Sequence, residues 1–368
     1  MKRSFDVAII GAGIGGLSIA HLFKGFSVAL IDAKNNPENV SFHTLGSFLD
    51  VKRFGLSEKV IAAEESEVMF CSPHFHVKKY GKAYIINKKQ LYKELLEKAK
   101  QQKVETFFGA RIAIIHENEN GVESIMDERG NEFLAKIFID ATGLSGLLSK
   151  RFGLQDKKLN IATGLEYNIA YYGKQERSYL LIGKLYQGGY GWLFPCGNKR
   201  AILGYGSFNP TAKKELKERL NKMLELSVFA GIVKKDNEKL EGGTVPTDIK
   251  TKFVYKNVVC LGDSVSQVNP LVGEGHRFIM EFALLAAAAI KKAIKRNDPE
   301  FLTEYEQQWK KKYLADYKRS KRGQKIADWI SNHDALSDLG ALYLASKKNK
   351  TFIKLLAGHV TWKNLLLP

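Results

Sequence analysis

The sequence predicts an α/β protein, and three features of its 368 residues lead to that prediction. Residues 1–35 read strand, glycine turn, helix, strand, which is how a Rossmann-like nucleotide-binding domain begins. Residues 160–208 are rich in apolar and aromatic runs separated by turn residues, as expected of an antiparallel sheet. After residue 275 the pattern is predominantly helical. We therefore expect an antiparallel β-sheet domain interleaved with a Rossmann-like domain, followed by a helical C-terminus.

The predicted nucleotide-binding domain is discontinuous and comprises residues 1–40, 82–155 and 250–297. Residues 41–81 and 156–249 would form the substrate-binding β-sheet domain, and residues 298–368 the helical C-terminal region. Two segments, 90–103 and 211–226, have the apolar spacing of amphipathic helices. The strands over residues 104–143 are expected to return the chain to the first sheet.

Composition excludes several classes of protein. The longest apolar run, FALLAAAAI, is about half the length of a bilayer-spanning helix. Three cysteines without CxxC spacing support neither a disulfide framework nor a metal site. The basic N-terminus breaks into glycines without a cleavage pattern, so we expect a cytoplasmic protein.

The formal charge of +18 is unusual, and residues 310–325 hold eight Lys or Arg against the single Asp316. Such a cluster suits an anionic membrane surface, for example the inner face of the cell membrane, or is simply a solvated helix face. No nucleic-acid-binding module accompanies it, so no nucleic-acid partner is expected.

The stretch GAGIGG satisfies GxGxxG directly after an apolar strand and before a helix. The glycines permit a tight turn, close approach to a pyrophosphate and close packing of helix on strand. Asp32 ends the next strand, where a carboxylate can accept both hydroxyls of an adenosine ribose. A dinucleotide site is therefore predicted, with contacts from Gly11, Ala12, Gly13, Ile14, Gly15, Gly16, Asp32 and Ala33.

Two later motifs favour FAD over NAD. IDATG closes a buried strand with a small-residue turn, and VVCLGDSVSQVNPLVGEGHRF is a buried strand followed by Asp263 and a second glycine-rich helix start. An extended flavin needs such contacts beyond the first turn, and the positive end of the second helix could stabilise a reduced flavin. The further expected FAD contacts are Lys88, Arg111, Asp140, Ala141, Gly143, Gly262, Asp263, Pro270, Gly273, Glu274, Gly275 and His276.

Three aromatic residues alternate in the stretch GYGWLFPCG. Period-two alternation puts Tyr190, Trp192 and Phe194 on one face of a strand. That face is either a buried part of the core or the wall of an apolar pocket, and the pattern alone does not decide between them.

The three motifs resemble those of flavoproteins of the para-hydroxybenzoate hydroxylase type over nearly the whole chain. Within that superfamily YGWLFP is similar to the YxWxFP motif of geranylgeranyl reductases. The resemblance implies an FAD-dependent enzyme that reduces carbon–carbon double bonds of isoprenoid lipids, with Tyr190, Trp192 and Phe194 lining a tunnel for a prenyl substrate. It also implies catalytic roles for Tyr190, as a candidate proton source besides an ordered water, and for Trp192, mainly through its shape.

The chain departs from that family at two places. SFHTLGSFLD has His43 and Thr44 where a cysteine is common, and we place His43 at the substrate. Lys88 stands where an arginine usually opens the helix near the flavin. No second GxGxxG follows a strand, so the electron donor is expected to be a docked NAD(P)H or a ferredoxin-like protein.

Two other functions fit the same scaffold. A flavin-dependent aromatic hydroxylase or halogenase would need a flavin hydroperoxide. The WxWxIP pattern of halogenases differs from YGWLFP, because Tyr190 stands in place of its first tryptophan and Phe194 in place of its isoleucine. A protein that retains FAD without catalysis is the second alternative.

Overall fold

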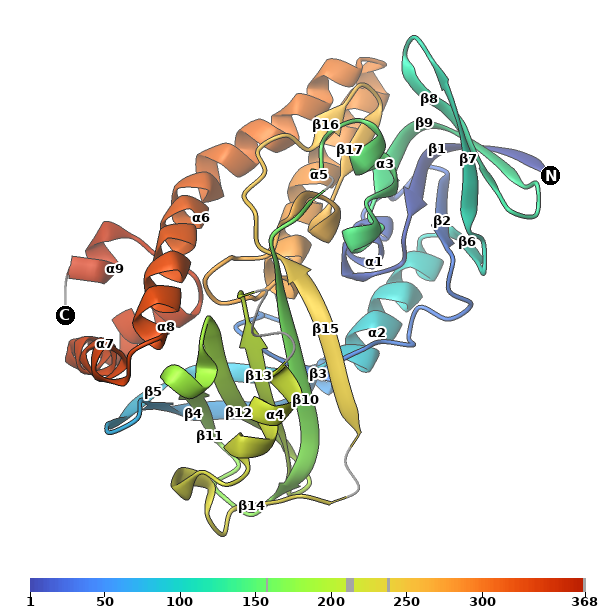
Figure 1. Cartoon of the computed structure of the whole chain (residues 1–368). Helices are drawn as coiled ribbons and strands as arrows, with labels where there is room; N and C mark the ends of the chain where they lie inside the picture. Colours follow the sequence, from blue (N-terminus) through green and yellow to red (C-terminus); the bar gives the residue numbers. More distant parts are fainter. Residues whose placement is uncertain (157, 210–214, 237–238, 367–368) are drawn as a thin grey trace.

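The computed structural model describes residues 1–156, 158–209, 215–236 and 239–366. Two multi-stranded sheets lie side by side, and helices from the last quarter of the chain run along both of them (Figure 1). Each sheet contains strands from separate parts of the chain.

The first sheet has a parallel core. Its central strands run in the order β17–β9–β1–β2–β6, and each neighbouring pair is parallel. Residues 7–10 of β1 are buried because helices and neighbouring strands cover both faces of the sheet. The strands of this sheet are β1 (Lys2–Ile10), β2 (Val28–Asp32), β6 (Glu105–Phe108), β7 (Ile112–Asn118), β8 (Gly121–Asp127), β9 (Glu132–Asp140), β16 (Val254–Tyr255) and β17 (Val258–Cys260).

Parallel strands place all of their carboxyl ends at one edge of the sheet, where ligands bind in open α/β folds. The glycine turn follows β1, Asp32 ends β2, the 140–143 turn follows β9, and Gly262 and Asp263 follow β17. The fold thus brings together three motifs that lie far apart in the sequence.

The second sheet has the order β14–β10–β13–β12–β11–β4–β5–β3, with β15 also paired to β10. All of its neighbouring pairs are antiparallel except β4 with β11. Its strands are β3 (Thr44–Ser47), β4 (Ile61–Cys71), β5 (His76–Asn87), β10 (Ile161–Tyr171), β11 (Arg177–Leu181), β12 (Gly189–Gly197), β13 (Arg200–Ser207), β14 (Val233–Lys234) and β15 (Leu240–Pro246).

The helices cover both sheets. α1 packs on α5 beside the first sheet, and α4 covers one face of the second. The helices are α1 (Ile14–Ala20), α2 (Lys88–Gln101), α3 (Leu147–Arg151), α4 (Leu216–Met223), α5 (His276–Arg296), α6 (Thr303–Ser331), α7 (Asp334–Ser346), α8 (Asn349–Leu356) and α9 (Trp362–Leu366). Among the described residues, no helix is both long and apolar enough to cross a membrane.

Three boundaries differ from the sequence-based expectation. β5 stays in the second sheet as far as Asn87, so the chain returns to the first sheet at α2 and not at residue 82. The helix expected over 90–103 is α2, which begins at Lys88 because the Asn87 side chain accepts the Gln90 N–H as a cap. The helix expected over 211–226 corresponds to α4, and positions 211–214 lie outside the described residues.

Candidate functional site

Three glycines of the turn after β1 have different roles. A Cβ at Gly11, which has φ +102°, would lie 2.3 Å from the Ala141 carbonyl oxygen, and one at Gly16 would meet the Gly11 carbonyl. A Cβ at Gly13 would meet nothing within 4 Å. Gly11 and Gly16 therefore allow strands and helix to pack, whereas Gly13 keeps open the space into which a pyrophosphate can come.

That open space is a cavity of about 130 Å³. Asp32 lies in its wall, and its carboxylate accepts the backbone N–H groups of Ala12 (2.5 Å) and Lys34 (2.7 Å). These bonds hold the carboxylate at the cavity while leaving acceptor capacity for a ribose. The lining residues are Ala12, Gly13, Asp32, Lys34, Pro37, Val40, Ser41, Lys88 and Tyr92.

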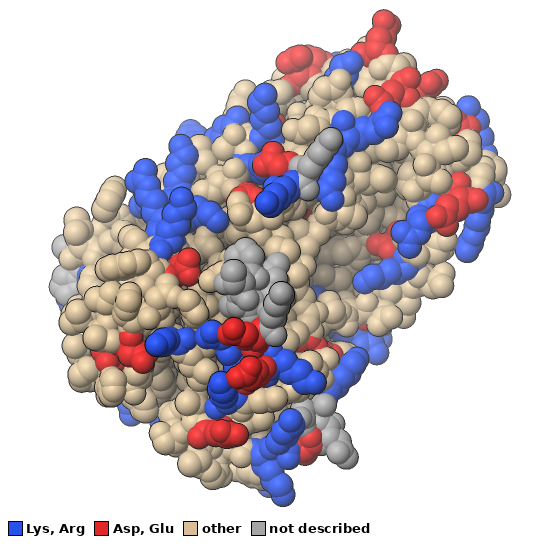
Figure 2. Space-filling model, viewed as in Figure 1, with Lys and Arg blue, Asp and Glu red and all other residues tan. Residues whose placement is uncertain are grey.

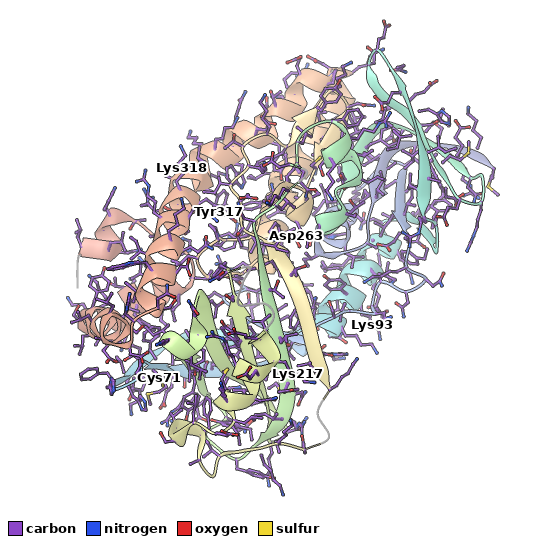
Figure 3. All side chains as sticks on the ribbon, in the orientation of Figure 1. Cys71, Lys93, Lys217, Asp263, Tyr317 and Lys318 are labelled. Carbon is purple, nitrogen blue, oxygen red and sulfur yellow. The ribbon has the colours of Figure 1, made fainter. Side chains whose placement is uncertain are left out.

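One residue of the cavity wall, Lys88, belongs to a cluster of titratable groups. Lys88 is buried and donates from Nζ to the Ser41 carbonyl (2.7 Å), and burial lowers its pKa to about 8. Burial raises the pKa of Asp263 to about 6, and the charge of Lys88 opposes that rise. In the part of the chain that the structure describes, no donor bonds to the Asp263 carboxylate, which lies centrally in the molecule (Figure 3).

His276, the first residue of α5, belongs to the same cluster. Burial, together with the charge of Lys88, lowers its pKa well below the usual value, so the ring is neutral at pH 7. Its Nε2 lies 3.4 Å from the Tyr92 hydroxyl. A neutral imidazole, an ammonium group and a carboxylate without a hydrogen-bond donor are groups that a polar cofactor segment can engage.

Asp140 acts differently from the expectation of a direct cofactor contact. Its side chain is fully buried, and its two oxygens accept the Thr142 hydroxyl and the backbone N–H groups of Thr142, Leu148 and Ser149. These donors belong to the turn after β9 and to the helix α3 that follows it. Asp140 therefore positions the turn, and the backbone of Gly143, whose added Cβ would meet nothing within 4 Å, is the part left open.

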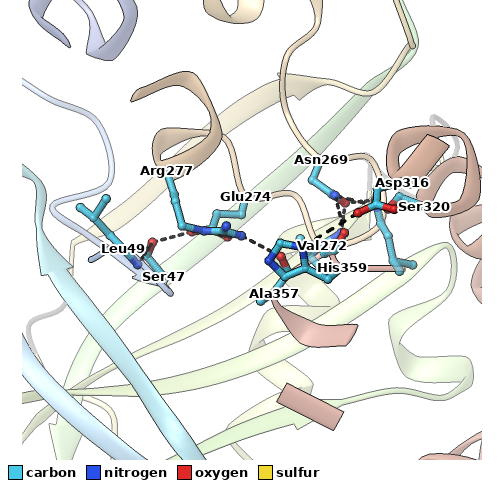
Figure 4. Close-up of polar contacts among 12 residues, drawn as sticks. Ser47, Leu49, Asn269, Val272, Glu274, Arg277, Asp316, Ser320, Ala357 and His359 are labelled. Atoms are coloured by element: carbon cyan, nitrogen blue, oxygen red, sulfur yellow. Dashed lines mark hydrogen bonds and ion pairs between the residues drawn. The ribbon is translucent and has the colours of Figure 1, made fainter. Parts of the chain in front are cut away.

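Residues 269–275 form a loop held at both ends. Glu274 accepts the Ser47 hydroxyl (2.5 Å) and pairs with Arg277 (2.8 Å), which also donates to the Ala357 carbonyl (Figure 4). The buried Asn269 side chain accepts the Leu271 N–H (3.0 Å) and donates to Ser320 on α6. Gly273 has φ +68°, and an added Cβ would meet only the Tyr190 hydroxyl within 4 Å. The Glu274 carboxylate is thus bonded to both Ser47 and Arg277.

These features fit an extended dinucleotide. The Asp32 carboxylate, the open glycine backbone and Asp263 follow β2, β1 and β17 along the carboxyl edge of the first sheet, and Lys88 lines the same cavity as Asp32. Arg111 does not join them: its side chain is 67% exposed and lies 3.7 Å from Glu128.

The aromatic stripe of β12 is confirmed as one face of a strand, and its burial distinguishes the two interpretations. Tyr190, Trp192 and Phe194 are only half-buried, whereas Leu193 on the opposite face is fully buried beneath α4 and its neighbours. A strand that buried its aromatic residues in the core would show the reverse. The stripe therefore lines an open side of the sheet.

Trp192 lies flat on a floor of glycine. The register pairs Trp192 with Gly204 on β13, and Gly164 and Gly206 flank that position. A Cβ at Gly204 would lie 2.2 Å from the indole Cε2, while at Gly206 and Gly164 it would lie 3.2 Å and 3.3 Å from the ring. The absence of side chains at these positions lets the indole cross β13, so that its upper face is an apolar platform.

Tyr190 joins the stripe to the loop of residues 269–275. Its hydroxyl donates to the Val272 carbonyl (2.6 Å), and burial raises its pKa to about 12, with the charge of Glu274 adding to the effect. Phe194, at the other end of the stripe, packs over Gly46 of β3. The structure thus brings all three predicted aromatic residues to one side of the sheet, where Tyr190 contacts the loop of residues 269–275.

Two carboxylates on the same face were missed by the sequence analysis. Glu166 on β10 pairs in register with Gly204 and with Glu241 on β15, so these positions form one row with Trp192. His43 is half-exposed and pairs through Nδ1 with Glu241, which also accepts the His43 N–H (3.0 Å). A lone glutamate in a β-rich stretch carries no local signal; only the register reveals it.

The chain is similar to known proteins over most of its length. The family model described as lycopene cyclase protein matches residues 6–324. A digeranylgeranylglycerophospholipid reductase of Methanocaldococcus jannaschii is 26% identical, over 95% of this chain and 94% of its own.

Solved structures are similar over comparable lengths. A geranylgeranyl bacteriochlorophyll reductase-like protein from Thermoplasma acidophilum has a TM-score of 0.84 at 19% identity, covering 100% of this chain and 96% of its own. A probable FAD-dependent monooxygenase from Pseudomonas aeruginosa has a TM-score of 0.73 at 19% identity, covering 91% and 99%. Both likenesses establish the fold.

Proposed function

The chain belongs to the lycopene cyclase protein family, and from that premise we propose that it is an FAD-dependent oxidoreductase that reduces carbon–carbon double bonds of isoprenoid lipids. The observation that carries the proposal is the half-buried aromatic stripe of β12, which faces the loop of residues 269–275 and is bonded to it by Tyr190. A long unactivated prenyl chain needs such an apolar wall.

FAD would be held along the carboxyl edge of the first sheet. The turn at Gly13 and Lys88 would receive the pyrophosphate, Asp32 the adenosine ribose, and Asp263 the ribityl hydroxyls. When bound and reduced by an electron donor, FAD would supply the hydride that an alkene reduction consumes. This chain's own residues then have to position the double bond and exclude water.

The aromatic stripe of β12 would position the substrate double bond. An isolated double bond offers no group to which a hydrogen bond could be directed, so the protein contributes orientation and a dry site. Trp192 has the largest flat surface on this face, and its glycine floor fixes the ring orientation. Holding two reactants in register accounts for a large part of many enzymatic rate enhancements, since it removes translational and rotational freedom beforehand.

We propose two alternative electron donors, a transiently bound NAD(P)H and a ferredoxin-like protein. The chain has a single GxGxxG turn of the strand-to-helix type, and FAD would occupy it. The many lysines would favour an acidic protein donor. Reduction by each donor in turn, followed through loss of flavin absorbance, separates the two.

The C-terminal helices supply a surface suited to a lipid substrate, which we call the C-terminal apolar surface. Trp329 on α6 and Trp362 on α9 are 60% and 62% exposed. Helix α7 packs against α6, and the Tyr343 hydroxyl on α7 donates to the Leu365 carbonyl on α9. Figure 2 shows this end of the molecule largely uncharged, with Lys and Arg side chains beside it. The exposed members are Ile326, Trp329, Leu339, Leu342, Tyr343, Trp362 and Leu366.

Aromatic side chains beside lysines are typical of proteins that lie on an anionic bilayer. Lys318, Arg322 and Lys325 on α6 are exposed and precede the apolar positions of the same helix. We therefore place the peripheral membrane contact at this surface and not at the basic segment alone.

An anaerobic reoxidation experiment tests the function. The purified protein, loaded with FAD and reduced by dithionite, is mixed with a geranylgeranylated glycerolipid in mixed micelles, and flavin absorbance and lipid mass are followed. Return of the oxidised spectrum, with two hydrogens gained by the lipid for each flavin, supports the reductase. No reoxidation by the lipid, together with oxygen consumption coupled to an aromatic substrate, would favour the monooxygenase alternative. A flavin that neither reaction reoxidises would point to a non-catalytic FAD protein.

A further inference from the structure

Reduction of an alkene needs a proton as well as a hydride, and the structure offers a candidate source on the aromatic face. Glu166 is 5% exposed, on β10, in the row that contains Trp192 and Gly204. Because Gly204 has no side chain, nothing on β13 separates the indole from the Glu166 carboxyl group. One carboxyl oxygen, Oε1, has no hydrogen-bond partner among the described residues. A buried carboxyl group without a full set of partners calls for an explanation.

The groups around Glu166 come from two other strands and one helix. Glu241 on β15 carries like charge, Lys88 on α2 carries opposite charge, and the Trp192 indole on β12 bonds to the carboxyl group. The Cys196 thiol on β12 also faces it, and burial raises the pKa of that thiol to about 11, so it is neutral at pH 7. Burial raises the pKa of Glu166 to about 8, with Glu241 adding to the rise and Trp192 and Lys88 opposing it.

Tyr190, the source that sequence reasoning suggests, is less suited. Its hydroxyl proton is committed to the Val272 carbonyl at 2.6 Å, and a phenol with a raised pKa releases a proton reluctantly. A carboxylic acid with a pKa near the working pH is the better general acid.

Glu241 and His43 lie between Glu166 and solvent. Glu241, its partner in register, is largely buried at 12% side-chain exposure, whereas His43, bonded to Glu241, is 53% exposed. Three titratable groups, His43, Glu241 and Glu166, thus lie in sequence from solvent to the aromatic face.

We propose that Glu166 is the acid that protonates the substrate double bond, and that Glu241 and His43 return the proton from solvent. This inference rests on the proposed reductase function. The hydride goes to one alkene carbon, the O–H bond of Glu166 breaks, and a C–H bond forms at the other carbon. The Glu166 carboxylate left behind is stabilised by the Trp192 N–H and by Lys88 until it takes up a proton from Glu241. Electrons come from the reduced flavin, so one hydride and one proton balance each bond reduced.

The test is the variant Glu166→Gln, which keeps the shape and the acceptor for Trp192 but has no acidic proton. We expect it to bind FAD and melt as the wild type does, while single-turnover reoxidation by the lipid slows at least 100-fold, as is usual on loss of a general acid. Glu166→Asp, which retains an acid, should recover part of the rate. Glu65→Gln is the matched control, since Glu65 is also buried with a pKa raised to about 8 by burial but bonds to Ser178 on β11.

Two readouts do not depend on turnover by the variant. The wild-type reoxidation rate should be level below pH 8 and fall as the pH rises through 8, because the acid form is then lost, with FAD kept saturating since Lys88 also loses charge there. Infrared difference spectra should contain a protonated carboxyl band at pH 7 that disappears in Glu166→Gln. A full rate in Glu166→Gln, or absence of that band, would overturn the role of Glu166 while leaving the reductase standing. A wild type that no isoprenoid reoxidises would overturn both.

Discussion

Gly204 offers the sharpest test of Trp192 as a substrate platform. In Gly204→Ala the new methyl group would lie 2.2 Å from the indole Cε2, whereas ordinary contact begins at 3.4 Å. The ring must therefore move by more than an ångström. Since Trp192 is half-buried, it can lift away from the sheet, and lifting would break its hydrogen bond to Glu166.

We expect Gly204→Ala to lower the free energy of unfolding only a little and to slow catalysis strongly. Overpacking a closed core costs about 1–3 kcal/mol, and a ring that can move into open space should keep the loss near the lower limit, about 1 kcal/mol. That corresponds to a fall in Tm of at most a few degrees. A displacement of about 1 Å at a positioning residue can reduce a rate about 100-fold.

The assay compares Gly204→Ala with Gly206→Ala, whose Cβ would lie 3.2 Å from the same ring and require only a slight shift. FAD retention, Tm and anaerobic reoxidation by the lipid are measured for both. We expect unchanged FAD, similar melting and a slow rate in Gly204→Ala alone. Equal, near wild-type rates in the two variants would refute the platform, and a Tm loss well above that of Gly206→Ala would mean that Trp192 belongs to the core.

Three further outcomes are expected. Gly13→Val should purify without yellow colour, because its side chain fills the open space at the turn; retention of stoichiometric FAD would contradict this placement. Asp140→Ala should lower Tm markedly, since four hydrogen bonds to a buried carboxylate are lost, and a carboxylate that mainly bound FAD would instead show a Tm loss only in the FAD-loaded protein. The double variant Trp329→Ser with Trp362→Ser should lose flotation with anionic vesicles at moderate salt, while the wild type floats with anionic but not neutral vesicles; equal flotation would place the contact elsewhere.

Local chemistry made much of the fold predictable. The turn at residues 11–16 with Asp32, the strand at 189–197 and the helical C-terminus each have a pattern that spans a few residues, and the structure confirms them as elements. The aspartates in the three glycine-rich turns look alike in sequence, yet Asp32 lines a cavity, Asp263 is buried, and the Asp140 carboxylate accepts backbone N–H groups of the residues that follow it. That difference depends on where the next backbone N–H groups point, which no short motif records.

Sequence position alone could not reveal the polar half of the site. Glu166 and Glu241 lie in different strands, and they meet only because β10 pairs with β15 in one register; a slip of one residue between the two strands would put their side chains on opposite faces of the sheet. His43 was expected at the substrate, but its partner Glu241 was not, because the two are separated by most of the chain.

Glycine links the apolar and polar halves of the site. In the first sheet, Gly13 leaves space for a ligand; in the second, Gly204 leaves space for a side chain of the protein itself. Any larger residue at 204 would stand between Trp192 and Glu166, so the same absence that flattens the platform also connects it to the buried acid. Substrate positioning and proton supply are therefore coupled through one residue, and a change at Gly204 should affect both: the slowed variant should also titrate at higher pH, because the Trp192 hydrogen bond that lowers the pKa of Glu166 is gone. A slow Gly204→Ala enzyme with the wild-type pH profile would show that the indole and the carboxyl group act independently.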